Sequence, residues 1–127
     1  MSKYLVVMVG GAIGAVSRFL AGSLIVRFYS ASFPLGTFVI NVTGSFLIGV
    51  LMTLFLNRPA VDAHWRLFLV TGVLGGYTTF SSFEWEALTT LRGGAEPIAF
   101  LYLCSSVVAG LVAAWLGLLI ANRVWPH

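Results

Sequence analysis

Charged side chains are scarce in this sequence of 127 residues: Asp, Glu, Lys and Arg make up only 9% of it, whereas 59% of the residues are hydrophobic. A soluble domain of this size has too small an interior to bury that much apolar surface. The apolar residues also form runs close to the length of about 20 residues that a bilayer crossing requires. The composition therefore predicts a small integral membrane protein.

The residues that build catalytic and metal centres are equally few. Cys104 stands alone, which excludes a disulfide framework and a Cys/His metal pattern, and its place in an apolar run predicts a packed thiol. His64 and His127 fall in a loop and in the tail, and no pair of carboxylates occupies an apolar pocket. No glycine-rich phosphate loop follows a strand pattern. We therefore do not expect an enzyme.

Basic residues exceed acidic ones, 7 to 4, but they stand at the ends of apolar runs and form no cluster. These end positions are occupied by Lys3, Arg27, Arg58, Arg66, Arg92 and Arg123. They predict interfacial anchors and no nucleic-acid site. The Lys/Arg bias between the two sides is weak, so the chain could insert in both directions and form an antiparallel homodimer. Insertion in a single orientation is the alternative.

Four apolar runs follow one another along the chain. They predict one all-α transmembrane domain over residues 1–127, with helices over about residues 4–26, 36–56, 65–91 and 98–121. The third run is longer than one crossing needs, as expected for an interrupted span. Because the number of crossings is even, both termini should lie on the same side of the membrane.

The third run contains a predicted break near Gly75–Thr79. Paired glycines disfavour a helix, and Tyr77, Thr78 and Thr79 are aromatic or β-branched. Irregular backbone survives at bilayer depth only where it is buried in protein or lines a wet cavity. Its free carbonyls can then bind a cation, and the restarted helix points its positive end at an anion. The alternative is a glycine packing notch in a continuous helix.

Small or polar residues recur at helical spacing in three of the runs. The stripes are Gly10, Gly14, Arg18 and Gly22; Thr37, Asn41, Ser45, Gly49 and Thr53; and Tyr102, Ser106, Gly110, Ala113 and Gly117. Such stripes let helices approach closely, and we expect nothing beyond packing from Gly10, Gly14, Gly49 and Gly117. Asn41 differs, because an amide within the membrane needs hydrogen-bond partners.

Ionisable side chains within the runs allow two interpretations each. Arg18 could extend to the interface, or it could have a structural or electrostatic role beside a pathway. Glu84 and Glu86 follow the predicted break and suit either a water-filled mouth or a plain interfacial position.

The remaining polar side chains are neutral hydrogen-bond donors that could line a transmembrane pathway. They are Asn41, Thr79, Ser81, Tyr102 and Ser106. The rings of Phe80 and Phe83 stand between them in the sequence, and phenyl edges are electropositive. Donors of this kind can replace part of an anion's hydration shell. The set favours passage of a small, dehydrated anion.

Three motifs at these residues resemble the small four-helix Fluc (CrcB) fluoride channels over nearly the whole length. They are GGxxGAxxR over residues 10–18, GTFVINVTGSFLIG over residues 36–49 and GxLGGYTTFSSFxxE over residues 72–86. The resemblance implies a dual-topology antiparallel homodimer in the bacterial plasma membrane. It implies two narrow pores that export fluoride passively, and one central structural sodium ion at the dimer interface.

The resemblance also implies residue roles. Asn41 would be a pore-lining donor, Phe80 and Phe83 would meet fluoride through their ring edges, and Glu86 would lie at a vestibule. The polar track would comprise Thr79, Ser81 and Tyr102. Backbone carbonyls of Gly75 and Thr78 would hold the sodium ion. The chain departs from the family pattern at Gly110, where some relatives have a pore serine, and at Glu84, where a small polar residue is common.

Two other functions fit a small membrane protein. A dual-topology small multidrug-type exporter would need an acidic residue in the first helix, where this chain has Arg18. A non-transporting membrane subunit would leave the broken third helix and Asn41 without a purpose. Fluoride efflux from liposomes would separate a fluoride channel from both alternatives.

Overall fold

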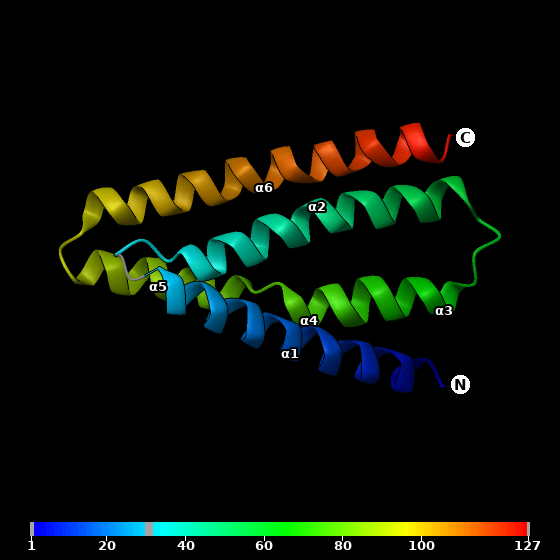
Figure 1. Cartoon of the computed structure of the whole chain (residues 1–127), viewed down its shortest axis with the longest axis horizontal. Helices are drawn as coiled ribbons and strands as arrows, with labels where there is room; N and C mark the ends of the chain where they lie inside the picture. The colour runs from blue at the N-terminus through cyan, green and yellow to red at the C-terminus, as the bar shows by residue number, and fades with distance from the viewer. Residues whose placement is uncertain (1, 30–31, 127) are drawn as a thin grey trace.

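The computed structural model describes residues 2–29 and 32–126, and this part of the chain is helical and contains no strand (Figure 1). Its three long helices are α1 (Lys3–Phe28), α2 (Leu35–Asn57) and α6 (Glu96–Val124). Each is long and apolar enough to cross a membrane. They extend the predicted helices by a few residues at their ends, and His127 lies outside the described residues.

The third crossing is assembled from shorter pieces. It comprises α3 (Ala63–Arg66), the π-helix η1 (Leu67–Leu74), α4 (Gly75–Tyr77) and α5 (Phe80–Arg92). The first three pieces follow one another without a gap, and two residues separate α4 from α5. π-helical turns are rare and are often found at functional sites.

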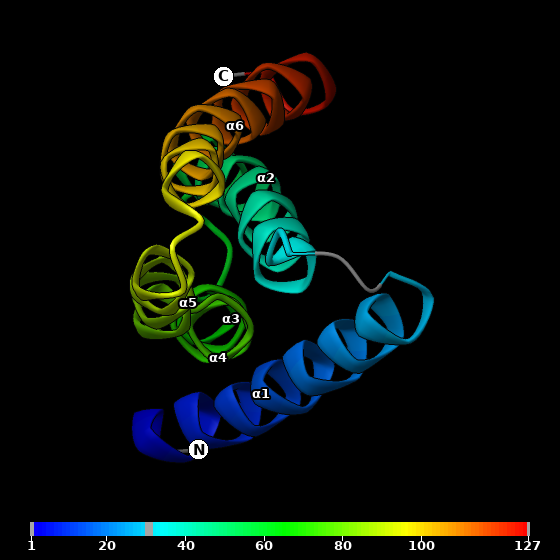
Figure 2. The ribbon, with the colours of Figure 1, turned by 90° about the vertical axis from the view of Figure 1, so that its left-hand side faces the viewer.

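The four crossings alternate in direction, so both described ends of the chain lie at the same end of the molecule (Figure 1). Helices α2 and α6 pack against each other along their lengths, and α1 lies on the far side of the third crossing (Figure 2). The third crossing packs against α1 through η1 and α4, and against α6 through α5. The gap between α4 and α5 is therefore the place where this crossing changes its packing partner.

Glycines allow the closest helix contacts, as the stripes predicted. A Cβ atom on Gly49 would overlap the Ala114 carbonyl of α6, and one on Gly117 would overlap the Phe46 carbonyl of α2. Gly10 of α1 likewise packs against backbone, because an added Cβ would lie 2.9 Å from the Gly72 Cα. Close backbone approach through small residues is the main way membrane helices gain packing energy. The predicted packing seams are confirmed.

The third crossing is interrupted at the C-terminal end of the predicted range Gly75–Thr79, because the paired glycines themselves are helical. Gly75 has helical dihedral angles (φ −62°, ψ −34°), and α4 continues through Tyr77. The extended residues are Thr78 (φ −78°, ψ 157°) and Thr79 (φ −149°, ψ 119°). Gly76 instead provides a packing notch, because a Cβ there would lie 2.5 Å from the Gly11 carbonyl oxygen of α1.

The prediction of a packed thiol is wrong, because Cys104 is exposed on the surface of the chain. An apolar run does not identify buried positions in a membrane protein. The outer face of α6 can be as apolar as its inner face, since lipid takes the place of the core.

Candidate functional site

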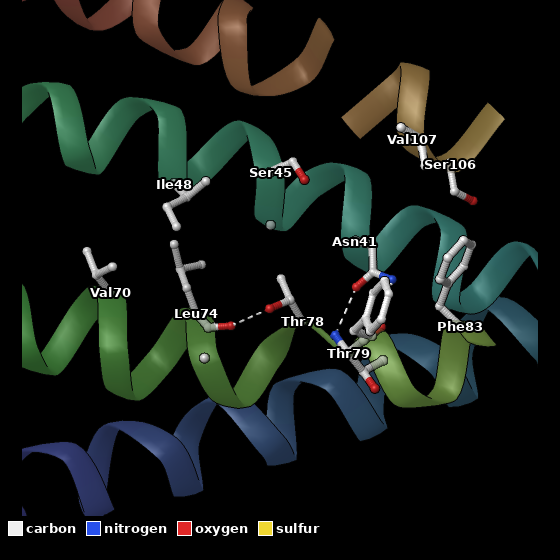
Figure 3. A pocket seen from close by; sticks show the side chains of 13 residues that line it. Asn41, Ser45, Ile48, Val70, Leu74, Thr78, Thr79, Phe83, Ser106 and Val107 are labelled. Atoms are coloured by element: carbon white, nitrogen blue, oxygen red, sulfur yellow. Dashed lines mark hydrogen bonds between the residues drawn. The ribbon is translucent and has the colours of Figure 1, made fainter. Parts of the chain in front are cut away.

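Asn41 binds the extended segment between α4 and α5 through both of its amide atoms (Figure 3). Its Nδ2 donates to the Thr79 carbonyl at 2.9 Å, and its Oδ1 accepts from the Thr79 amide at 2.9 Å. The side chain thereby satisfies the backbone groups that the end of α4 leaves without helical partners. Asn41 has the partners that its place in the membrane requires.

Two further side chains hold the same segment. Arg18 of α1 donates from Nη1 to the Thr78 carbonyl at 3.2 Å, and the Thr78 hydroxyl donates to the Leu74 carbonyl at 2.9 Å. Arg18 is half-buried here, which favours the structural interpretation of this residue over extension to the interface. The backbone at the break is therefore bound by the charged Arg18 side chain of α1 and by the neutral Asn41 side chain of α2.

The start of α5 is capped from within the segment. The Thr79 hydroxyl accepts from the Ser82 amide at 3.3 Å and lies 2.9 Å from the Ser82 hydroxyl, to which it donates. An N-cap of this kind fixes the direction in which a helix starts. The partially positive end of α5 therefore begins beside Asn41, inside the bundle.

A groove of about 380 Å³ lies along this segment, between α2, the third crossing and α6 (Figure 3). Its polar lining residues are Asn41, Ser45, Thr78, Thr79 and Ser106. Phe80 and Phe83 line it too, and its remaining walls are largely aliphatic. The groove therefore combines neutral donors with apolar surface and has no acidic or basic side chain in its lining.

Ser106 has an unusual position in the groove. Its Oγ atom is shut off from solvent and has no hydrogen-bond partner within residues 2–29 and 32–126. A buried hydroxyl without a partner costs about 1–3 kcal/mol, so such a group normally has a ligand or a water molecule.

The aromatic residues of the site form a chain of contacts. The Phe80 and Phe83 ring centroids are 5.9 Å apart, and Phe83 meets Tyr102 edge-on at 5.1 Å. Phe83 is buried, at 8% exposure, whereas Phe80 is 70% exposed in the single chain. Edge-on packing directs electropositive ring edges at neighbouring groups.

Glu86 accepts two hydrogen bonds from neighbouring helices. The Thr37 hydroxyl of α2 donates to its Oε1 at 2.8 Å, and the Tyr102 hydroxyl of α6 donates to its Oε2 at 2.8 Å. Tyr102 is fully buried. Two donors are therefore arranged around a negative group next to the aromatic chain.

A second cavity, of about 980 Å³, lies between α1, the start of α2 and α5. Its lining includes Arg18, Thr37, Thr79, Ser82 and Glu86. Thr79 also lines the smaller groove, so the extended segment separates the two spaces. We call this larger cavity the vestibule.

Most of the predicted site residues are brought together around the segment 78–79. Ser81 is not, because it is exposed and lines neither cavity, and Glu84 is exposed as well. No site role was predicted for Thr37, Ser45 or Ser82, although each of them lines one of the two cavities. The first two belong to the polar stripe with Asn41 at four-residue spacing, and this stripe was the signal for them.

Within the described residues, no three His, Cys, Asp or Glu side chains come close enough together to hold a metal ion. A cation in this region would need neutral oxygen ligands. The groove itself offers the Ser106 hydroxyl, which has no partner among the described residues, and the second hydrogen of Asn41 Nδ2, and neutral donors of this kind can replace part of the hydration shell of a small anion.

Comparison with known proteins agrees with this chemistry. The chain is 47% identical over 121 residues to the fluoride-specific ion channel FluC of Solibacter usitatus, covering 95% of this chain and 99% of that protein. It is 45% identical over 122 residues to the protein of that name from Acidobacterium capsulatum, covering 96% and 98%. For the Caulobacter sp. strain K31 protein, again named FluC, the identity is 42% over 126 residues, with 98% of each chain covered.

A family description matches the same part of the chain. Residues 5–118 match the family described as CrcB-like protein, Camphor Resistance (CrcB), and this match includes every residue of the groove. Family match and relatives coincide over nearly the full length, and the chain belongs to the CrcB-like family.

Proposed function

We propose that this protein is a fluoride-selective ion channel that exports fluoride passively across the bacterial plasma membrane and so lowers cytoplasmic fluoride. The observation that carries the proposal is the groove, in which neutral donors from three crossings meet aromatic ring edges without a charged side chain in the lining. The full-length likeness to proteins named fluoride-specific ion channels supports it.

The donors suit fluoride better than chloride. Fluoride is the smaller ion, the stronger hydrogen-bond acceptor and the more costly to dehydrate, so it needs a set of preorganised donors. Asn41 is fixed in place by its two bonds to the Thr79 backbone, and its Nδ2 keeps a second hydrogen that can be donated to an ion. The Phe83 ring is fixed by its contact with Tyr102 and can present its edge to the ion.

Glu86 lines the vestibule and accepts a hydrogen bond from Tyr102, which packs against Phe83 of the groove. Its carboxylate receives the Thr37 and Tyr102 hydroxyls, which therefore already point at a negative group. A fluoride ion can take these hydrogen bonds when the carboxylate turns towards the vestibule, which Glu86 also lines. The exchange keeps each hydroxyl bonded to one anion throughout, so no donor is left unsatisfied.

The functional unit of the proposal is an antiparallel, dual-topology homodimer with two pores. Thr71 and Gly75 are both exposed, one turn apart on the third crossing, and Phe80 is exposed as well. Polar backbone beside an interrupted helix is unfavourable in lipid. A second, inverted copy of the chain would cover this face, and the weak charge bias of the loops permits the inverted insertion.

The homodimer is proposed to hold one structural sodium ion on its axis through the Gly75 and Thr78 carbonyls. The residues fit such an ion. The Thr79 amide donates to Asn41, which leaves the Gly75 carbonyl without its helical partner, and a Cβ on Gly75 would find nothing nearer than 3.8 Å. The Thr78 carbonyl accepts from Arg18 and keeps a second lone pair. Neutral hard oxygens suit a monovalent cation, which would stabilise the assembly.

The test is fluoride efflux from liposomes that contain the purified protein, measured with a fluoride electrode after a potassium ionophore is added. Fluoride should leave rapidly and chloride should hardly leave. Equal chloride efflux would refute a selective channel, and efflux that depends on a proton gradient would indicate an exchanger. A multidrug-type exporter is not favoured, because α1 contains no acidic residue.

A further inference from the structure

The turn that starts α2 fixes the backbone of an aromatic residue, Phe33. Pro34 has φ −73° and ψ 67°, and the Leu35 amide donates to the Phe33 carbonyl at 2.8 Å, which makes an inverse γ-turn. Proline fixes its own φ and also restricts the residue before it. The Phe33 side chain therefore starts from a well-defined position at the end of the bundle.

The Phe33 ring contacts two other rings. It meets Phe38 of α2 with 5.5 Å between centroids and 70° between planes. This contact is a hydrophobic staple, because Phe33 precedes the N-cap Pro34 and Phe38 lies in the first turns of the helix. The ring also meets Tyr102 of α6 edge-on, at 5.3 Å and 83°. The staple explains the first contact, but it gives no reason for the second.

Tyr102 is isolated from the vestibule by this second contact. Phe33 and Phe83 both pack edge-on against the Tyr102 ring, which is fully buried, and its hydroxyl donates to Glu86 Oε2 at 2.8 Å. Phe33 and Glu86 line the vestibule, whereas Tyr102 does not. The Phe33 ring is therefore part of the wall between the vestibule and Tyr102.

This wall matters because the vestibule can hold water. It has a volume of about 980 Å³, and its lining includes the charged side chains of Arg18 and Glu86 and several hydroxyls. Water at the Tyr102 hydroxyl would compete with any other acceptor for its hydrogen bond. Without the Phe33 ring, Tyr102 would also lose one of the two ring contacts that fix its orientation.

We propose that Phe33 is a positioning residue for fluoride conduction. Its ring holds Tyr102 in place and keeps vestibule water away from the hydroxyl that passes between Glu86 and the ion. The inference rests on the proposed function, because it names that ion as fluoride. Phe33 acts through Tyr102 and does not bind the ion itself, since it does not line the groove. The same end of α2 carries Thr37, the other donor to Glu86.

The first test compares Phe33→Leu with Phe38→Leu. Both variants lose the ring pair of the staple, so their melting temperatures in detergent should fall by similar amounts. Only Phe33→Leu also loses the ring contact with Tyr102, and Phe38 lines neither cavity. Fluoride efflux from liposomes should fall about fivefold for Phe33→Leu, as expected for the loss of one aromatic pair, and should stay within about twofold for Phe38→Leu.

The second test asks whether Phe33 acts through the Tyr102 hydroxyl. Tyr102→Phe keeps the ring and removes the hydroxyl, and its efflux should fall about tenfold, as for the loss of one hydrogen bond to an anion. The double variant Phe33→Leu/Tyr102→Phe should conduct as Tyr102→Phe does, because no hydroxyl is left to position. A purely structural role of Phe33 would instead multiply the two losses, to about fiftyfold.

The outcomes separate this inference from the proposed function. If the unmodified protein conducts no fluoride, the proposed function is refuted, and the role of Phe33 with it. If the unmodified protein conducts, equal efflux from Phe33→Leu and Phe38→Leu, or multiplied losses in the double variant, overturns only the role of Phe33. Every variant is first shown to elute as an intact assembly in size-exclusion chromatography. If Phe33→Leu does not, Phe33→Met takes its place, because its flexible side chain fills irregular gaps better.

Discussion

Replacing Asn41 by alanine should abolish fluoride conduction at a modest cost in stability. The variant loses both hydrogen bonds to the Thr79 backbone, each 2.9 Å long. Two interhelical hydrogen bonds in a membrane protein contribute about 1–3 kcal/mol together. The fold should therefore persist, but the extended segment loses its position and the groove loses a donor. Removal of one preorganised donor typically costs about 100-fold in rate.

Asn57→Ala is the matched control for this prediction. Asn57 lies on the same helix, is buried, and its Nδ2 donates to the Asn122 Oδ1 at 2.9 Å and to the Trp125 carbonyl at 2.7 Å. It lines neither the groove nor the vestibule. Both variants should lose similar stability when heated in detergent, and efflux from liposomes should fall only for Asn41→Ala. Equal efflux from the two variants would refute the role given to the Asn41 hydrogen bonds.

Three further predictions concern the rings, the packing and the assembly. Phe83→Ile and Phe80→Ile should both lose fluoride efflux, but only the former should destabilise the monomer, because Phe83 is buried and Phe80 is 70% exposed in the single chain. Gly49→Val should disrupt the seam between α2 and α6 and lower the yield of folded protein, whereas Gly11→Ala should not, since a Cβ there meets nothing within 4 Å. Cysteine tags at either terminus, in a Cys104→Ala background, should be labelled from both faces of the cell, and replacement of sodium by a large organic cation should dissociate the dimer. Labelling from one face, or an unchanged dimer, would contradict the proposed assembly.

Local composition was enough to predict the class of protein and the positions of its helices. Long apolar runs have few alternatives to a membrane helix, because backbone groups in lipid must bond within their own segment. The glycine packing seams could also be predicted, from the spacing of small residues along each helix. Gly49 and Gly117 lie where a side chain would meet the neighbouring backbone, and helical periodicity places such residues on one face without knowledge of the partner.

The position of the break required the tertiary structure. The sequence placed the interruption only within Gly75–Thr79, whereas the extended residues are Thr78 and Thr79. Helix propensity is a weak local term, and it is overridden here by Asn41 and Arg18, which bind the backbone of this segment from 38 and 60 residues away. The partners of Asn41 are main-chain atoms that carry no sequence signal.

The sequence by itself determined a four-crossing membrane protein, its polar stripe on the second helix and its family, because these depend on hydrophobicity and on spacing along one helix. Only the tertiary structure decided that Ser81 lies outside both cavities, that the Thr37 and Tyr102 hydroxyls both donate to Glu86, and that Gly110 packs beside the Ser45 side chain. Each of these depends on the rotation and offset of one helix against another. Those quantities are set by the summed packing of whole helix faces, which no single segment contains.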